Sequence, residues 1–151
     1  MNRLNMIQAI INKNNYTSFL EIGVARGDVH GKIIISTKTG VDPCPTPYES
    51  VINSTSDEFF QTNTNKFDII FIDGDHSFEQ SRKDFYNSVD ILNKGGTILL
   101  HDIDQLGDPR ARGWVCRTWE EITQNPKFNT QKIHVPYDQD YMGVVTINET
   151  N

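Results

Sequence analysis

The sequence contains few cysteines, no long apolar run and no excess of basic residues. Its two cysteines, Cys44 and Cys116, lie far apart, which fits neither a zinc site nor a disulfide framework, so we expect small semi-buried residues. No stretch approaches the length of a membrane-spanning helix. Acidic residues outnumber Lys and Arg by 20 to 14, for a net charge of −6, which argues against nucleic acid and anionic membranes as partners. We therefore expect a cytoplasmic protein that binds neither.

The length of 151 residues suits one domain with a single core, spanning residues 1–151. Charged and apolar fractions are those of an ordinary folded protein. Proline is also scarce, but Pro43, Pro45 and Pro47 make a stiff loop in which no helix can form. Because a helix usually occupies this place in α/β folds, we expect the helices to be trimmed here.

The segment F-L-E-I-G-V-A-R-G, residues 19–27, is the centre of the sequence. It begins as an apolar run typical of a central parallel strand. Gly23 and Gly27 then allow a tight turn whose backbone N–H groups can approach a ligand. Such a turn alone is a weak signal, because glycines often serve only packing at these positions.

Strand and helix patterns alternate along the rest of the chain. Helices are predicted over 3–13, after the capping boxes Thr55/Glu58 and Ser77/Gln80, and from Asp108-Pro109, where the buried stripe is Val115, Thr118, Trp119 and Ile122. The second capping box opens a helix that we expect Gly95-Gly96 to stop. Residues 29–34 suit a short helix, or a strand over 33–35. Strands are predicted to end at Ile22, Asp42, Asn53, Asp73 and Asp102, with a final antiparallel pair over 132–135 and 142–147.

This order predicts a doubly wound, Rossmann-like, mostly parallel sheet. Ligands bind beyond the carboxyl ends of such strands. Asp42 is placed there to accept hydrogen bonds from a ribose diol, although Asp before proline is also a common turn former. Ser56 and Asp57, at a helix start, can contact a base edge or simply cap the helix.

A dense group of acids and histidines follows two neighbouring strands, comprising Asp73, Asp75, His76, His101 and Asp102. Their carboxylates can bind a hard divalent cation such as Mg²⁺. His76 can take a proton from a hydroxyl or an amine. The alternative is structural: Asp75 favours the following helix dipole and the histidines satisfy buried backbone groups.

The motifs F-L-E-I-G-V-A-R-G, G-V-D-P, T-S-D-E-F-F, F-D-I-I-F-I-D-G-D-H and L-N-K-G-G-T-I-L-L-H-D resemble those of class I S-adenosylmethionine-dependent methyltransferases. They are most similar to a small bacterial and phage group with I-D-G-x-H and L-H-D signatures. The resemblance covers about residues 17–147 and implies a seven-stranded sheet with a C-terminal antiparallel hairpin. It also implies S-adenosylmethionine as cofactor and a small-molecule acceptor.

The resemblance assigns roles to individual residues. It places Glu21, Gly23 and Gly27 along the methionine part of the cofactor, Asp42 on the ribose, Ser56 and Asp57 on the adenine, and Asp73 at the cofactor. Compared with metal-dependent catechol O-methyltransferases, Asp73 and Asp102 match metal ligands and His76 stands where the catalytic lysine falls. The third ligand, an asparagine, is replaced by Ile103, which cannot coordinate, so Asp75, His101 or Asp104 would have to substitute.

The hypothesis is O-methylation of a small or sugar-like acceptor, with His76 as general base and Asp73 and Asp102 orienting it or binding metal. His101, Arg110, Arg112 and Tyr137 are the candidate acceptor residues, and Tyr141 also lies near the rim. A nicotinamide oxidoreductase would require G-x-G-x-x-G, and a metal phosphohydrolase would require further ligands around His101-Asp102. The main alternative is a non-catalytic S-adenosylmethionine-binding module or partner subunit. The sequence leaves a homodimer open.

Overall fold

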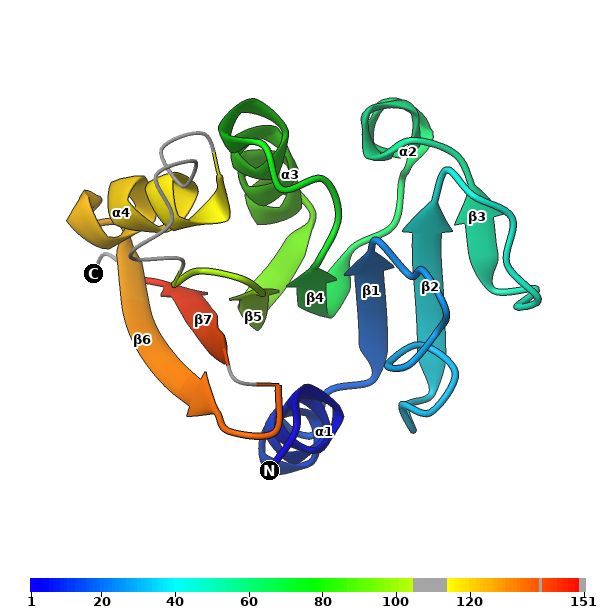
Figure 1. Cartoon of the computed structure of the whole chain (residues 1–151), viewed down its shortest axis with the longest axis horizontal. Helices are drawn as coiled ribbons and strands as arrows, with labels where there is room; N and C mark the ends of the chain where they lie inside the picture. Colours follow the sequence, from blue (N-terminus) through cyan, green and yellow to red (C-terminus); the bar gives the residue numbers. More distant parts are fainter. Residues whose placement is uncertain (105–113, 139, 150–151) are drawn as a thin grey trace.

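The computed structural model describes residues 1–104, 114–138 and 140–149 (Figure 1). Its helices and strands follow the chain in the order α1 (Arg3–Asn14), β1 (Ser18–Ile22), β2 (Thr37–Asp42), β3 (Val51–Asn53), α2 (Ser56–Thr62), β4 (Phe67–Ile72), α3 (Phe78–Asp90), β5 (Leu92–Leu100), α4 (Val115–Gln124), β6 (Phe128–Val135) and β7 (Asp140–Ile147). None of the described helices is long and apolar enough to cross a membrane.

The strands form one seven-stranded sheet in the order β3-β2-β1-β4-β5-β7-β6. Strands β1 to β5 are parallel, whereas β7 runs antiparallel to both β5 and β6. The predicted Rossmann-like fold with its C-terminal antiparallel hairpin is therefore confirmed. The strand order reverses between β1 and β4, so a ligand site is expected where these two strands end.

Alternation along each strand divides the core into two layers. Leu20, Ile70 and Ile98 are among the side chains on one face, which α2, α3 and α4 cover. Phe19, Ile69 and the apolar stripe of α1 pack on the other face. Figure 1 shows α1 alone below the sheet and the other three helices above it. Because β1, β4 and β5 are covered on both faces, their apolar runs lack polar alternation.

The segment after Gly27 differs from the prediction, because it forms neither an α-helix nor a strand. Residues 28–32 make turns, in which Gly31 N donates to Gly27 O and Ile33 N to Val29 O, both at 2.9 Å. Two causes are visible. Gly27 and Gly31 pack tightly against the Tyr48 ring, and glycine and β-branched isoleucine are weak helix formers.

The boundary between α3 and β5 also differs from the prediction. The helix ends at Asp90, and Leu92 already belongs to β5, so Gly95-Gly96 lie inside the strand and do not stop the helix. The strand register shifts between Phe67 and Ile69, and Gly95 has a φ of +78°, which glycine tolerates at an irregularity in a strand.

The predicted capping boxes have different outcomes. The Thr55/Glu58 box is present in full. The Ser77 hydroxyl accepts from Gln80 N as expected, but the Gln80 side chain turns instead towards Ser56, Asp57 and Asp84. The buried stripe of α4 is confirmed, whereas the predicted helix start at Asp108-Pro109 lies outside the described residues.

Candidate functional site

The glycine turn follows β1 in the chain and packs against the backbone at the end of β4. Gly23 has a φ of +85° and donates its N–H to Val41 O at 2.9 Å. A Cβ on Gly23 would lie 2.2 Å from Asp73 O, and one on Gly27, whose φ is +77°, would lie 2.2 Å from the Tyr48 ring. Both glycines are therefore required by backbone conformation and by close packing.

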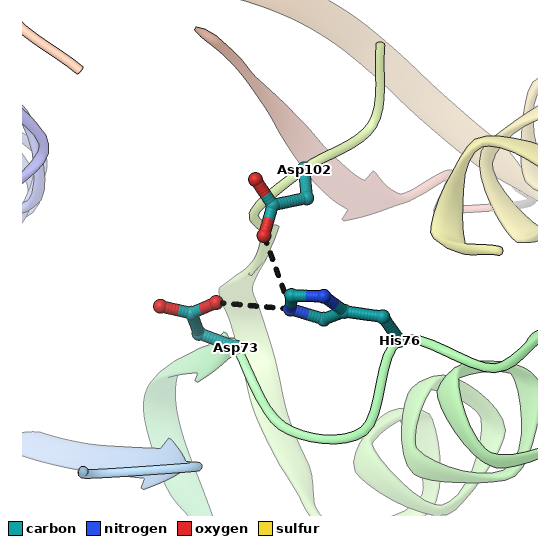
Figure 2. A group of neighbouring side chains, drawn as sticks. All are labelled: Asp73, His76 and Asp102. Carbon is teal, nitrogen blue, oxygen red and sulfur yellow. Dashed lines mark ion pairs between the residues drawn. The ribbon is translucent and has the colours of Figure 1, made fainter. Parts of the chain in front are cut away.

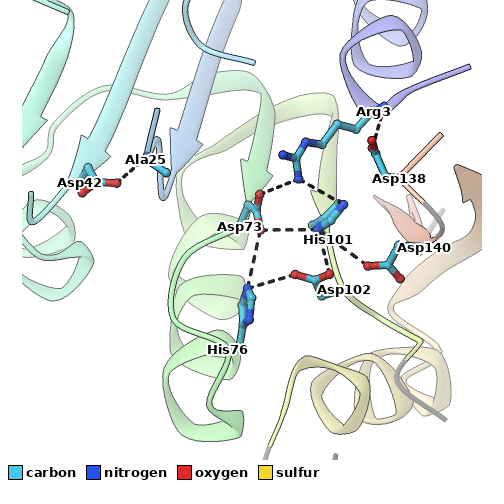
Figure 3. A network of polar contacts seen from close by, with 9 residues as sticks. All are labelled: Arg3, Ala25, Asp42, Asp73, His76, His101, Asp102, Asp138 and Asp140. Carbon is cyan, nitrogen blue, oxygen red and sulfur yellow. Dashed lines mark hydrogen bonds and ion pairs between the residues drawn. The ribbon is translucent and has the colours of Figure 1, made fainter. Parts of the chain in front are cut away.

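The Asp42 carboxylate supports this turn directly. Its Oδ2 accepts from Ala25 N at 2.8 Å (Figure 3), and its Oδ1 accepts from Cys44 N, also at 2.8 Å. Ala25 has a φ of +48°, a conformation that costs energy in a non-glycine residue and requires support from its surroundings. Asp42 thus organises the glycine turn, and its contact with a ribose stays a prediction.

Two cavities adjoin Gly23. The Ser56 cavity, about 250 Å³, is lined by Ile22, Gly23, Val41, Pro43, Thr55, Ser56, Asp57, Gly74, Asp75, Gln80 and Asp84. The Glu21 cavity, about 180 Å³, is lined by Arg3, Glu21, Gly23, Val24, Ala25, Arg26, Asp28, Val29 and Asp73. A ligand lying across the turn would extend into both. Most residues predicted to bind the cofactor line one of them; Gly27 and Asp42 instead shape the turn between them.

Glu21 forms a buried pair beneath the Glu21 cavity. Its Oε2 lies 3.6 Å from His30 Nδ1, and both side chains are almost fully buried. Nε2 of His30 lies 2.7 Å from Ser50 Oγ. Burial raises the pKa of Glu21, and the contact with His30 offsets this only in part. His30 was not predicted as a site residue, because a lone histidine after the turn carries no sequence signal.

Five titratable side chains at the ends of β4, β5 and β7 form what we call the acid–histidine cluster: Asp73, His76, His101, Asp102 and Asp140. Nε2 of His76 lies 3.1 Å from Asp102 Oδ2 and 3.7 Å from Asp73 Oδ1 (Figure 2). Nδ1 of His101 lies 3.1 Å from Asp102 Oδ1 and 4.0 Å from Asp140 Oδ2 (Figure 3). Of the five residues predicted to form one group here, Asp73, His76, His101 and Asp102 are brought together, whereas Asp75 instead accepts from Ser77 N.

The cluster strongly perturbs the ionisation of its members. Hydrogen bonding with Asp102 and Asp73 raises the pKa of His76 to about 10. Burial tends to raise the pKa of Asp102, but hydrogen bonds from His101 and His76 outweigh it and hold the pKa well below its usual range. Burial and the nearby Asp102 raise the pKa of Asp140 to about 7. In this arrangement His76 is an imidazolium at neutral pH.

Asp102 also adopts a left-handed backbone conformation, with a φ of +56°. Such a conformation in a residue other than glycine is uncommon and clusters at functional sites. Asp102 thus combines a strained backbone with contacts to both His76 and His101, and it is the centre of the acid–histidine cluster.

Arg3 and Asp140 belong to the site but were missed by the sequence interpretation. Nη1 of Arg3 lies 3.3 Å from Asp73 Oδ2 and 3.4 Å from His101 Nε2 (Figure 3). Arg3 begins α1 and Asp140 begins β7. Neither carries a local motif, and only the packing of α1 and the hairpin against the end of the sheet brings them to Asp73 and Asp102.

The described side chains provide two groups of metal-ligand atoms, Asp73/His76/Asp102 and His101/Asp102/Asp140. Of the three residues considered as substitutes for the missing asparagine, only His101 belongs to such a group. Asp75 accepts from Ser77 N at 2.7 Å, Asp104 pairs with Lys132, and Ile103 is buried.

The remaining acceptor candidates have other outcomes. Tyr137 is 83% exposed, in the turn between β6 and β7. Arg110 and Arg112 lie outside the described residues, so their contact with an acceptor stays a prediction.

The chain closely shares its fold with solved methyltransferase structures. An O-methyltransferase from Bacillus cereus in complex with SAH has a TM-score of 0.71 and 15% identity, over 97% of this chain and 80% of that one. A putative caffeoyl-CoA O-methyltransferase from Staphylococcus aureus has a TM-score of 0.76 and 19% identity, over 96% and 82%. The N-methyltransferase NodS from Bradyrhizobium japonicum WM9 has a TM-score of 0.69 and 16% identity, over 98% and 95%.

Residues 35–103 match a family model described as a methyltransferase domain. A comparison with curated proteins gave no significant match. The family model over residues 35–103 and the fold shared with solved O- and N-methyltransferases both agree with the resemblance that the motifs carry.

Proposed function

We propose that this chain is a methyltransferase that transfers a methyl group from S-adenosylmethionine to an oxygen atom of a small or sugar-like acceptor. The observation that carries the proposal is the position of the acid–histidine cluster beside the Gly23 turn, with Asp73 contacting His76 and lining the Glu21 cavity. A cofactor spanning the turn and an acceptor at His76 would therefore meet at Asp73.

The residues around Gly23 suit this cofactor better than a phosphate-bearing nucleotide. Among the described residues that line the two cavities beside Gly23, six are carboxylates and two, Arg3 and Arg26, are cationic. A pyrophosphate would be repelled there, whereas a ligand with an amine and a sulfonium cation would be favoured. We assign the methionine part to Glu21, Gly23, Gly27 and Asp73, the ribose to Asp42, and the adenine to Ser56 and Asp57.

When bound, S-adenosylmethionine supplies a methyl group already activated on a sulfonium, so the protein has to align the acceptor and manage one proton. We assign the proton to His76. Because two carboxylates stabilise its protonated form, His76 can act as a base only after these contacts weaken. Positive charge at Asp73 and Asp102 would weaken them, and a divalent cation there is part of the proposal.

The stabilised protonated form of His76 favours a second candidate, a protein that binds S-adenosylmethionine without catalysing methyl transfer. A protonated histidine cannot act as a base, and a protein that only binds the cofactor would not need His76 to lose its proton. The two candidates share cofactor binding and differ in turnover.

Calorimetric titration of the purified protein with S-adenosylmethionine and S-adenosylhomocysteine, with and without Mg²⁺, tests the shared claim. We expect saturable binding that Asp42→Ala weakens by about 10-fold or more, since the turn loses two hydrogen bonds to a charged group. Asp90→Ala, which removes an exposed carboxylate from the end of α3, is the matched control. A change in affinity with Mg²⁺ would favour metal at Asp73 and Asp102. Absence of binding of either ligand refutes both candidates.

A further inference from the structure

Asp84 is a buried carboxylate to which neither the motifs nor the proposed mechanism assigns a role. It lies in the middle of α3, lines the Ser56 cavity and is 1% exposed. Its Oδ1 accepts from Gln80 Nε2 at 2.9 Å. Its Oδ2 has no hydrogen-bond partner among the described residues. That oxygen lies 3.7 Å from where a Cβ on Gly74, another lining residue, would stand.

The wall of the cavity around Asp84 is short of donors. Nε2 of Gln80 faces three acceptors, namely Ser56 Oγ at 3.1 Å, Asp57 Oδ1 at 3.0 Å and Asp84 Oδ1 at 2.9 Å. The two carboxylate oxygens can only accept, which fixes the orientation of the amide, and an amide nitrogen carries two hydrogens. The Ser56 hydroxyl also contacts the Asp84 carboxylate, but Asp84 Oδ2 has no hydrogen-bond partner among the described residues. A buried acceptor without a donor costs free energy, and a ligand N–H would supply that donor.

The rest of the cavity restricts what that ligand can be. Ile22, Val41 and Pro43 provide apolar surface, which suits a flat ring system. The lining carboxylates exclude an anionic group. The ligand must therefore supply an N–H donor, present a flat apolar surface and carry no negative charge. An aromatic base with an exocyclic amine, in a nucleoside without phosphate, meets these three conditions.

We propose that Asp84 accepts a hydrogen bond from the exocyclic amine of the adenine base and thereby selects adenine in the Ser56 cavity. This inference rests on the proposed function and extends it, since it names the residue that reads the base. Asp84 is thus a specificity residue, with Gln80 holding its carboxylate in place. Burial raises the pKa of Asp84, which contacts with Ser56 and Gln80 offset only in part, and an amine donor would stabilise the carboxylate.

The test compares two ligands by calorimetry on the wild-type protein. One is S-adenosylhomocysteine, and the other is its 6-desamino analogue, whose purine carries hydrogen in place of the amine. We expect the analogue to bind about 10- to 100-fold more weakly, because it leaves a charged acceptor unpaired. Equal affinity for the two ligands overturns the inference while leaving the proposed function intact. Binding of neither ligand refutes the proposed function and the inference with it.

A ligand-by-residue cycle assigns the effect to Asp84. Asp84→Ala should bind S-adenosylhomocysteine as weakly as it binds the analogue, with its affinity for the analogue close to that of the wild type. Asp90→Ala, the same substitution at an exposed position of the same helix, should keep the full discrimination. An Asp84→Ala variant that weakens both ligands by the same factor overturns the assignment, because a merely structural role predicts that result.

Discussion

His76 Nε2 lies between the carboxylates of Asp102 and Asp73, at 3.1 and 3.7 Å. This contact pattern gives the ring two opposed properties. It orients the imidazole towards the end of β4 and β5, as a catalytic base requires, and it raises the pKa of His76 to about 10, which keeps the proton on the ring. The ability of His76 to accept a proton therefore depends on whether a cation binds to the carboxylates of Asp73 and Asp102.

His76→Ala is expected to lower turnover by about 10²- to 10⁴-fold, the usual contribution of a general base. The affinity for S-adenosylhomocysteine should be unchanged, since His76 lines neither cavity. Single-turnover kinetics and calorimetry on the same preparation separate the two effects.

The matched control is His134→Ala, which removes an exposed histidine from β6. If His76→Ala turns over an identified acceptor as fast as the wild type, the base is another group.

At the scale of the element, the turn between β1 and β2 is held by contacts on both of its sides. Asp42 at the end of β2 accepts from Ala25 N, and Gly23 packs on the backbone at the end of β4. The turn cannot move without disturbing the ends of three strands, and this rigidity suits a ligand site formed largely by backbone groups.

A pair of glycine substitutions measures this packing. Gly95→Ala imposes only a left-handed conformation, because a Cβ there meets nothing within 4 Å, and it should cost about 1–2 kcal/mol of unfolding free energy. Gly23→Ala has a similar positive φ but adds a clash with Asp73 O at 2.2 Å. It should cost a further 1–3 kcal/mol, roughly, and abolish cofactor binding.

Urea denaturation of the two variants gives the comparison directly. Equal losses in the two variants would mean that the backbone of β4 yields to the new methyl group. In that case the turn is softer than its contacts indicate.

At the scale of the whole molecule, function and stability depend on opposite ends of the central strands. The site lies at the carboxyl ends of β1, β4 and β5. At the amino-terminal ends of these strands, Asp68 Oδ2 accepts from Thr17 N at 2.8 Å and from Ser18 N at 3.1 Å. Its Oδ1 accepts from Asn93 Nδ2 at 2.8 Å. One carboxylate thus ties together the beginnings of three strands, far along the strands from the ligand site.

Asp68→Asn should lower the unfolding free energy by about 1.5–3 kcal/mol at neutral pH, the contribution of hydrogen bonds to a charged group. Burial tends to raise the pKa of Asp68, but the hydrogen bonds from Thr17, Asn93 and Ser18 outweigh it and hold the pKa below 3.8. The stabilisation is therefore present above the unfolded-state pKa and is lost as the pH falls through the lower folded-state value.

The measurement is urea denaturation of wild type and Asp68→Asn from neutral pH to about pH 3, near and below the ordinary carboxyl pKa. The gap between the two should stay constant above that value and narrow below it. Affinity for S-adenosylhomocysteine at neutral pH should not change. A gap that stays constant down to the lowest pH would mean that other groups hold these strands together.

The sequence by itself determined the order of strands and helices apart from the element expected after Gly27, together with the glycine turn and the acids at the strand ends. These features depend on local rules: apolar runs for buried strands, capping residues such as Thr55 and Ser77, and glycine where φ is positive. They sufficed to place Asp73, His76, His101 and Asp102 at one sheet edge, and family resemblance added the cofactor.

Only the tertiary structure decided which further side chains meet them. Arg3 reaches Asp73 across 70 residues of sequence, and Asp140 arrives on β7. Asp84 lines the Ser56 cavity and has one carboxylate oxygen without a hydrogen-bond partner among the described residues. No local pattern specifies these positions, because each results from the packing of a helix or hairpin on the finished sheet. The ionisation of His76 was undetermined for the same reason, since a pKa depends on neighbours that folding brings within 4 Å.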